Sequence, residues 1–164
     1  MKTAVIYYSL SGNTRRIARM AAEASGADIA EIEPASAYEG EYMEIVEQGK
    51  REVEEGFLPD VRPLPIDIGG YDCIIIGSPT WWYTIAPAVR SFVRSQNWQG
   101  KLVIPFTTNG GWPGEALDDL GKACRGASVK CGREIRFDSS GGNDLVTPQK
   151  DIDRWLKEIK TAIM

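Results

Sequence analysis

The 164-residue sequence contains no histidine and only three cysteines. The absence of histidine removes the commonest general base and the commonest metal ligand, which argues against triad hydrolysis and most zinc chemistry. Cys73, Cys124 and Cys131 form neither a C-x-x-C pair nor an even disulfide set. This cysteine usage fits a reducing compartment, so we expect a cytoplasmic protein without a metal site.

Long apolar runs and basic clusters are also missing. No stretch approaches the length of a membrane span, and the start of the chain lacks the cleavage pattern of a signal peptide. With 19 basic and 23 acidic residues the net charge is −4, which is a poor match to nucleic acid or to an anionic membrane. The composition, 43% hydrophobic and 26% charged, is typical of a globular protein, and we expect one domain spanning residues 1–164.

A hydroxyl-rich turn lies between the first predicted strand and the first predicted helix. Residues 2–8 are an apolar run typical of a buried parallel strand, and apolar residues recur at helical spacing from Ile17 to Ala22. The free amides and the dipole of such a helix favour an anion at the turn. Gly12 lets a ligand approach the backbone, and three hydroxyls can donate to phosphate oxygens. We therefore predict a phosphate site made of Ser9, Leu10, Ser11, Gly12, Asn13 and Thr14.

The same residues would also suit a plain turn with a helix cap. Three hydroxyls and a glycine within six residues are more than a connection needs, which favours the phosphate interpretation. The chain has neither a G-x-G-x-x-G motif nor the G-K-[ST] of the triphosphate-binding loop. We therefore expect a single terminal phosphate, held without a dedicated lysine.

The rest of the chain alternates between strand-like and helix-like segments. Further strands are predicted over 28–33, 73–77, 101–107 and 129–137, and helices over 41–55, 85–95, 117–124 and 148–163. Five strands alternating with five helices predict a three-layer α/β/α sandwich around a parallel sheet of order 2-1-3-4-5. The ligand of such a sheet lies beyond the carboxyl ends of the strands, where the winding direction reverses. This rule selects the loops Ser9–Thr14, Ser78–Tyr83 and Thr107–Gly114.

Two of these elements have an unusual composition. The helix over 41–55 carries Tyr42, Ile45 and Val46 on one face and charged residues on the other, which we interpret as a solvated surface. The fourth strand contains Pro105, which has no backbone N–H to donate to a neighbouring strand and is therefore unusual in the centre of a sheet. The last strand, over 129–137, is predicted to run without an insertion.

Tryptophans gather at the predicted ligand end of the sheet. Trp81, Trp82 and Tyr83 lie in the second selected loop, and Trp112 lies in the third. Exposed loop tryptophans reduce solubility unless a flat group covers them, so we predict a pocket for a large aromatic ring. We expect one of Trp81 and Trp82 to form a wall of this pocket and the other to fold back as a hydrophobic cap. A phosphate cradle beside aromatic walls suggests FMN. The side chains placed to meet its ribityl chain or polar ring edge are Thr80, Thr107, Thr108 and Asn109.

On these residues the chain resembles the flavodoxin family over essentially its full length. The 9–14 turn is similar to the family's phosphate signature, residues 77–82 to its first ring-flanking loop in a branch with a double tryptophan, and residues 107–112 to its second. The resemblance implies a flavodoxin-like fold and non-covalent FMN. The cofactor-binding residues that it implies are Ser9, Leu10, Ser11, Gly12, Asn13, Thr14, Pro79, Thr80, Trp81, Trp82, Tyr83, Thr107, Thr108, Asn109, Gly110, Gly111 and Trp112.

The resemblance also implies that the flavin transfers one or two electrons and that no side chain need act as acid or base. We expect an electron carrier that serves redox partner proteins or small electron donors and acceptors, and electron transfer is favoured over independent catalysis. The alternative is an FMN-dependent NAD(P)H:quinone-type or flavin oxidoreductase. Many flavodoxins have a glycine after the first-loop tryptophan, whereas Trp82 and Tyr83 fill that stretch here and leave room for this different use.

A phosphoryl-accepting signalling receiver shares the 2-1-3-4-5 strand order and is a third possibility. A receiver needs acidic residues at the end of its first strand to hold Mg²⁺. Tyr7, Tyr8 and Ser9 stand at that position, which argues against this function. A purely structural role would leave the clustered tryptophans and hydroxyls unexplained.

Overall fold

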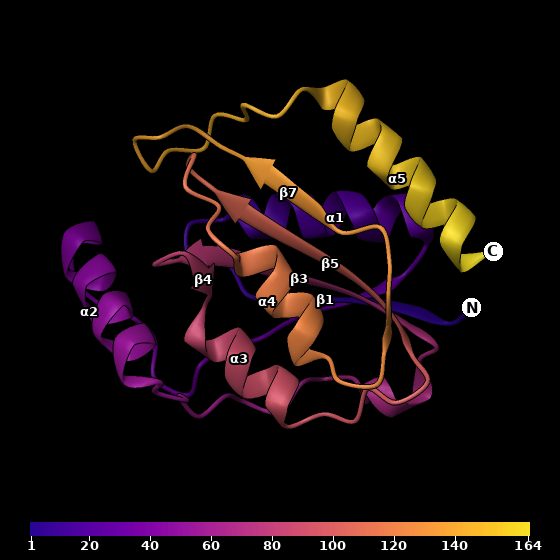
Figure 1. Ribbon diagram of the computed structural model, residues 1–164, viewed down its shortest axis with the longest axis horizontal. Helices are drawn as coiled ribbons and strands as arrows, with labels where there is room; N and C mark the ends of the chain where they lie inside the picture. Colours follow the sequence, from indigo (N-terminus) through magenta and orange to yellow (C-terminus); the bar gives the residue numbers. More distant parts are fainter.

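The computed structural model describes residues 1–164 as three layers with a parallel sheet in the middle (Figure 1). The main path of the sheet is β2-β1-β3-β5-β6, and β7 also pairs with β5. The strands are β1 (Thr3–Tyr7), β2 (Asp28–Glu31), β3 (Cys73–Trp81), β5 (Leu102–Asn109), β6 (Ser128–Val129) and β7 (Arg133–Arg136). When β6 and β7 are taken as one interrupted strand, this is the predicted order 2-1-3-4-5, so the predicted fold class is confirmed.

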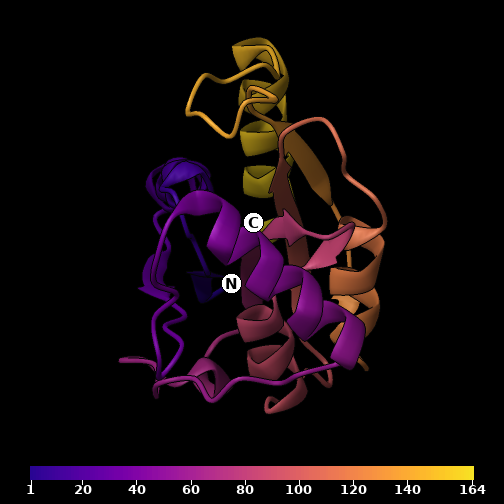
Figure 2. The same ribbon diagram turned by 90° about the vertical axis from the view of Figure 1, so that its left-hand side faces the viewer.

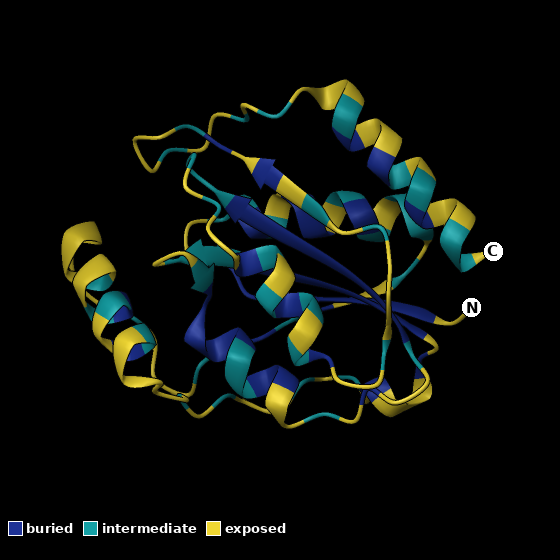
Figure 3. Cartoon of the chain, viewed as in Figure 1, coloured by how far each residue is buried: buried dark blue, intermediate teal, exposed yellow.

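Helices cover both faces of the sheet. On one face α1 (Asn13–Ser25) and α5 (Gln149–Ile163) bury a core that includes Trp155 and Phe106. On the other face α3 (Pro87–Arg94) and α4 (Ala116–Ala123) pack over a second core, and a short 3₁₀ turn, Ile68–Gly70, borders it. Figure 3 shows the central strands β1, β3 and β5 largely buried between these helices. None of the helices combines the length and the apolarity needed to span a bilayer.

The first ring-flanking loop differs from its prediction, because residues 78–81 continue β3 instead of forming a loop. The ladder with β5 runs on through Pro79, and β3 then turns back into β4 (Thr84–Ile85) as an antiparallel hairpin. Trp82 and Tyr83 form the two-residue turn with φ of +49° and +68°. Such turns normally use asparagine and glycine, so the two aromatic residues gave no turn signal. The hairpin holds Trp81 on regular backbone at the end of the sheet.

The last strand is broken, so the prediction of an uninterrupted strand over 129–137 is wrong. Between the paired positions Val103 and Phe106, β5 advances three residues, whereas the edge advances four, from Val129 to Arg133. One extra residue is the signature of a β-bulge. Val103 faces this edge, because its carbonyl accepts from the Lys130 amide at 3.0 Å. Pro105, two residues on, faces the same way without an N–H, which explains why the ladder breaks there.

Helix α2 (Tyr42–Glu55) lies across the carboxyl end of the sheet rather than on either face (Figure 2). Its apolar face does not meet the core, since Tyr42 is 56% exposed and Val46 is 36% exposed. Its buried residues are Gly49 and Glu52. The Glu52 carboxylate accepts hydrogen bonds from the Tyr38 hydroxyl at 2.7 Å and from the Gln48 side-chain amide at 2.9 Å. The expectation that the charged face is solvated is therefore wrong for Glu52.

Candidate functional site

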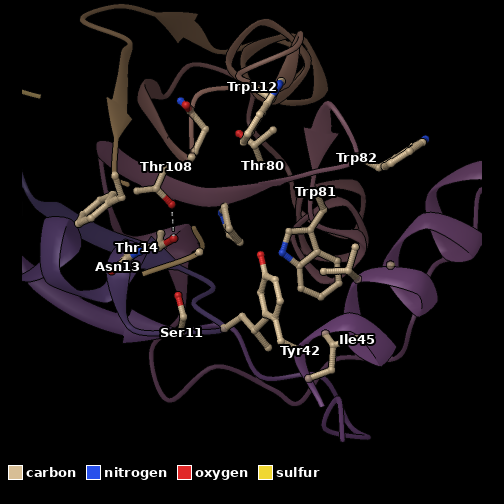
Figure 4. Close-up of a pocket in the computed structure, with 18 of the residues that line it drawn as sticks. Ser11, Asn13, Thr14, Tyr42, Ile45, Thr80, Trp81, Trp82, Thr108 and Trp112 are labelled. Atoms are coloured by element: carbon tan, nitrogen blue, oxygen red, sulfur yellow. Dashed lines mark hydrogen bonds between the residues drawn. The ribbon is translucent and has the colours of Figure 1, made fainter. Parts of the chain in front are cut away.

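A cavity of about 370 Å³ opens at the carboxyl ends of β1, β3 and β5, where the predicted loops meet. All predicted site residues line it except Ser9, Gly12, Thr107 and Gly111. Figure 4 shows Ser11, Asn13 and Thr14 on one side of the cavity and Trp81 with Tyr42 on the other. Lining residues that the sequence reasoning missed come from α2 and from the loop after β7. They are Tyr42, Ile45, Val46, Gly49, Lys50, Phe137, Asp138, Ser139, Gly141 and Gly142.

The turn before α1 presents unpaired amides to the cavity. No acceptor in the chain takes the backbone N–H groups of Ser11, Asn13 and Thr14. Ser9 lies behind them, and its hydroxyl accepts hydrogen bonds from the amides of Gly12 at 3.1 Å and Arg15 at 3.2 Å. The structure therefore gives Ser9 the task of shaping the turn, and the free amides at the helix start suit an anion.

Two buried threonines join the phosphate turn to β5. The hydroxyls of Thr14 and Thr108 lie 2.8 Å apart, and the residues are 1% and 4% exposed. This is the dashed contact in Figure 4. Either oxygen can be the donor. When Thr108 donates, the Thr14 proton is free for an acceptor in the cavity.

The loop after β7 closes the phosphate end, and a single carboxylate organises it. Asp138 accepts from the amides of Ser140 at 3.1 Å, Gly142 at 2.9 Å and Asp144 at 2.9 Å, and from the Ser140 hydroxyl. The Asn13 side-chain amide donates to the Gly142 carbonyl at 3.0 Å, which ties this loop to the start of α1. The polar run 138–143 was visible in the sequence. The loop also follows the carboxyl end of a parallel strand, so the rule on ligand position applies to it as well.

The hydrogen bond from the Ser140 side chain, followed by those from the loop amides, lowers the pKa of Asp138 from 3.8 to about 2. The stabilisation is therefore fully present above pH 4 and is lost as the pH falls toward 2. We expect Asp138→Asn to lower the urea midpoint of unfolding at pH 7, because an amide cannot accept as many of these bonds. Urea melts at several pH values should show the deficit shrinking below pH 4. A deficit that stays the same between pH 7 and pH 3 would contradict this assignment.

The three tryptophans at the other end of the cavity have different surroundings. Trp81 packs inward, with its ring edge-on to Tyr38 at 4.8 Å and to Tyr8 at 5.8 Å between ring centroids. Trp82 is 45% exposed and Trp112 is 59% exposed. Trp81 is therefore the inward-folded member of the pair, and it packs against these tyrosines and the adjoining core. It still lines the cavity.

One lining hydroxyl lacks a partner within the chain. Thr80 Oγ1 is buried and forms no hydrogen bond, although Thr80 borders the cavity. Leaving a buried hydroxyl unsatisfied costs about 1–3 kcal/mol, so a polar ligand atom at this position would be favoured. The Thr107 hydroxyl is also buried without a partner, but Thr107 lies outside the lining.

The cavity carries little side-chain charge, because only Lys50 and Asp138 among its lining residues are charged. Burial, assisted by Glu31 and Glu52, raises the pKa of Tyr8. Burial and the hydrogen bond to Glu52 likewise raise the pKa of Tyr38. Both phenols therefore stay neutral at physiological pH. No group of three or more cysteine, aspartate or glutamate side chains is arranged to hold a metal ion. The arrangement suits binding a flat phosphorylated molecule.

Comparison with known proteins finds flavoproteins among the similar solved structures. A candidate flavoprotein from Bacteroides eggerthii is 29% identical, with a TM-score of 0.77 over 96% of this chain and 97% of that one. A flavoprotein from Lactobacillus acidophilus in complex with FMN is 23% identical and shares the fold, with a TM-score of 0.71 over 94% of this chain and 97% of that one.

An NAD(P)H dehydrogenase (quinone) from Archaeoglobus fulgidus is 28% identical in an alignment of 114 positions that covers 64% of this chain. The matched part is 60% of the length of that relative. The family described as Flavodoxin matches residues 2–158, which include all of the cavity lining. Since this match spans nearly the whole sequence and the fold agrees, the chain belongs to the flavodoxin family.

Proposed function

We propose that this protein binds FMN non-covalently and passes one or two electrons between redox partners, either proteins or small donors and acceptors. The observation that carries the proposal is one cavity with free amides and hydroxyls at one end and tryptophans at the other. Family membership and the FMN complex of the Lactobacillus protein support FMN as the cofactor. We propose the cytoplasm as the compartment, because all three cysteines are free thiols.

Each part of the cavity has a task in this function. The amides of Ser11, Asn13 and Thr14 would hold the phosphate, with the Asp138 loop closing over it. The unpaired Thr80 hydroxyl would meet a polar atom of the cofactor. The aromatic end would cover the ring system and exclude water. Bound FMN supplies the redox chemistry, so the chain needs no catalytic acid or base.

A second candidate is an NAD(P)H:quinone-type oxidoreductase. The Archaeoglobus relative carries that description, and the apolar face of α2 supports it. Tyr42, Ile45 and Val46 line the cavity without packing on the core, which leaves a surface for a flat second substrate. Steady-state oxidation of NAD(P)H with a quinone distinguishes the two functions. Turnover supports the reductase, and a negligible rate in the FMN-loaded protein supports the carrier.

The first test of the proposed function is a fluorescence titration of FMN with the apo-protein. Stacking against tryptophan quenches flavin fluorescence, so we expect quenching at one FMN per chain with micromolar affinity or better, about −8 kcal/mol. Unquenched fluorescence together with no binding by equilibrium dialysis would overturn the proposal.

Replacing Ser11 by alanine tests the phosphate end. Hydrogen bonds to charged groups contribute about 1.5–3 kcal/mol, so FMN affinity should fall roughly tenfold to a hundredfold if the hydroxyl donates to the phosphate. Riboflavin lacks the phosphate and is the internal control, since its affinity should change by less than about twofold. Equal losses for the two ligands, measured by titration, would remove Ser11 from the phosphate site.

A further inference from the structure

The charge of the cavity is concentrated in two side chains at different ends. Among the lining residues only Lys50 and Asp138 are charged. The Asp138 carboxylate is occupied by the amides and hydroxyl of its own loop at the phosphate end. Lys50 projects from α2 at the tryptophan end, and it is the one cation of the lining.

The Lys50 ammonium lies over the ring of Trp82, a lining residue, although carboxylates are available on its own helix. Glu47 and Glu54 stand three residues before and four residues after it, which are spacings that normally allow ion pairs. No carboxylate oxygen lies within the 4.0 Å limit of an ion pair with Lys50. Its Nζ atom instead lies 4.6 Å from the centroid of the Trp82 ring. Figure 4 shows Trp82 beside α2, farther than Trp81 from Ser11 and Thr14.

The neighbours of Lys50 fix this orientation of the helix. A Cβ atom at Gly49 would lie 2.9 Å from Trp81 Cε3, so only glycine lets α2 approach Trp81 this closely. Three residues after Gly49, nearly one helical turn on, Glu52 is 8% exposed and bonded to Tyr38. These contacts hold one side of α2 against the site, and Lys50 borders the cavity beside them.

We propose that Lys50 stabilises the anionic reduced form of FMN in this cavity. The inference rests on the proposed function and adds to it a residue that sets the redox preference of the site. Reduction adds two electrons and one proton to the neutral ring system of FMN and leaves one negative charge. An ammonium in a partly buried site attracts that charge and has no such attraction for the neutral oxidised ring. The protein therefore binds reduced FMN more tightly, relative to oxidised FMN, than it would without Lys50.

The test uses Lys50→Met in the FMN-loaded protein. The midpoint potential of the two-electron couple is measured anaerobically, with dithionite as the electron donor and a reference dye. Fluorescence titration gives the affinity for oxidised FMN. We expect the ratio of reduced to oxidised affinity to fall about tenfold, which is a shift of about 30 mV toward lower potential. Lys50→Arg should keep the ratio within about twofold, because it retains the charge.

Lys122→Met is the matched control. Lys122 is exposed on α4 and paired with Asp118 at 2.6 Å, and it does not line the cavity, so its removal should leave the potential unchanged. The proposal is overturned if Lys50→Met and Lys122→Met have the same potential. It is also overturned if Lys50→Met weakens oxidised and reduced FMN equally, which would reduce Lys50 to a contact with Trp82. If the wild-type chain fails to bind FMN, the proposed function falls and this inference falls with it.

Discussion

Replacing Gly114 by alanine is expected to weaken FMN binding by roughly ten- to a hundredfold, which corresponds to the loss of one or two aromatic contacts. Gly114 has a φ of +52°, and a Cβ there would lie 2.3 Å from the Tyr83 carbonyl oxygen and 2.6 Å from its Cα. These are backbone atoms, which cannot rotate away as a side chain can. The hydrogen bond of 2.9 Å from the Glu115 amide to Tyr83 would break. The Trp82–Tyr83 turn would then separate from the loop that carries Trp112.

Gly100→Ala is the matched control for this experiment. Gly100 also has a positive φ, +78°, but a Cβ there meets nothing within 4 Å. The alanine should cost roughly 1 kcal/mol of stability through backbone strain and leave FMN affinity unchanged. Fluorescence titration of FMN with both variants distinguishes the effect of backbone strain, which both share, from that of the collision with Tyr83, which only Gly114→Ala has. Wild-type affinity in Gly114→Ala would show that the two loops do not need this contact.

Replacing Gly77 by alanine is expected to destabilise the whole domain by about 3 kcal/mol or more, through overpacking. A Cβ at Gly77 would lie 2.1 Å from Phe106 Cζ and 2.4 Å from its Cε2. Phe106 is fully buried and edge-on to Trp155 at 5.5 Å between centroids, so the ring has nowhere to move. The collision separates β3 from β5 at the point where the cavity begins.

Urea unfolding followed by tryptophan fluorescence measures this effect as a lower midpoint. Gly70→Ala is the control, because the nearest atom to a Cβ there is the flexible end of Lys2 at 3.8 Å. Its midpoint should stay close to that of the wild type. A Gly77→Ala protein within about 1 kcal/mol of the wild type would mean that the core relaxes around the methyl group.

The order of the sheet could be predicted because each central strand is a short apolar run bounded by glycine, proline or polar residues. A run such as Cys73–Ile76 exposes apolar side chains on both faces of a strand, so it is stable only in a sheet that is covered on both faces. The residues at which the strands end could not be predicted from apolar runs. Residues 78–81 look like loop in composition, and only pairing with β5 and β4 makes them strand. Pairing is a tertiary property that composition does not carry.

The predicted half of the site came from loops that follow β1, β3 and β5, which are neighbours in the sheet. Ser11 and Thr14 had a local signal, because hydroxyls before a helix can bind an anion wherever the chain goes next. Tyr42 and Lys50 had no such local signal, since the sequence of their helix has the pattern of an ordinary amphipathic surface helix. Only the position of α2 across the sheet end turns them toward the cavity. Asp138 was readable as a turn residue, but its place beside the start of α1 depends on a contact 129 residues apart, from Asn13 to Gly142.

The break between β6 and β7 also bears on how copies of this protein behave toward one another. An uninterrupted edge strand offers a row of free amides and carbonyls on which another chain can add a strand, a common start of aggregation. Here the edge is two short strands interrupted by a bulge, and the exposed side chains of Lys130, Glu134 and Arg136 place charges of both signs along it. A second molecule would meet a bent, charged ladder too short to extend. The bulge beside Pro105 thus shortens the ladder that this edge of the sheet can offer to another strand.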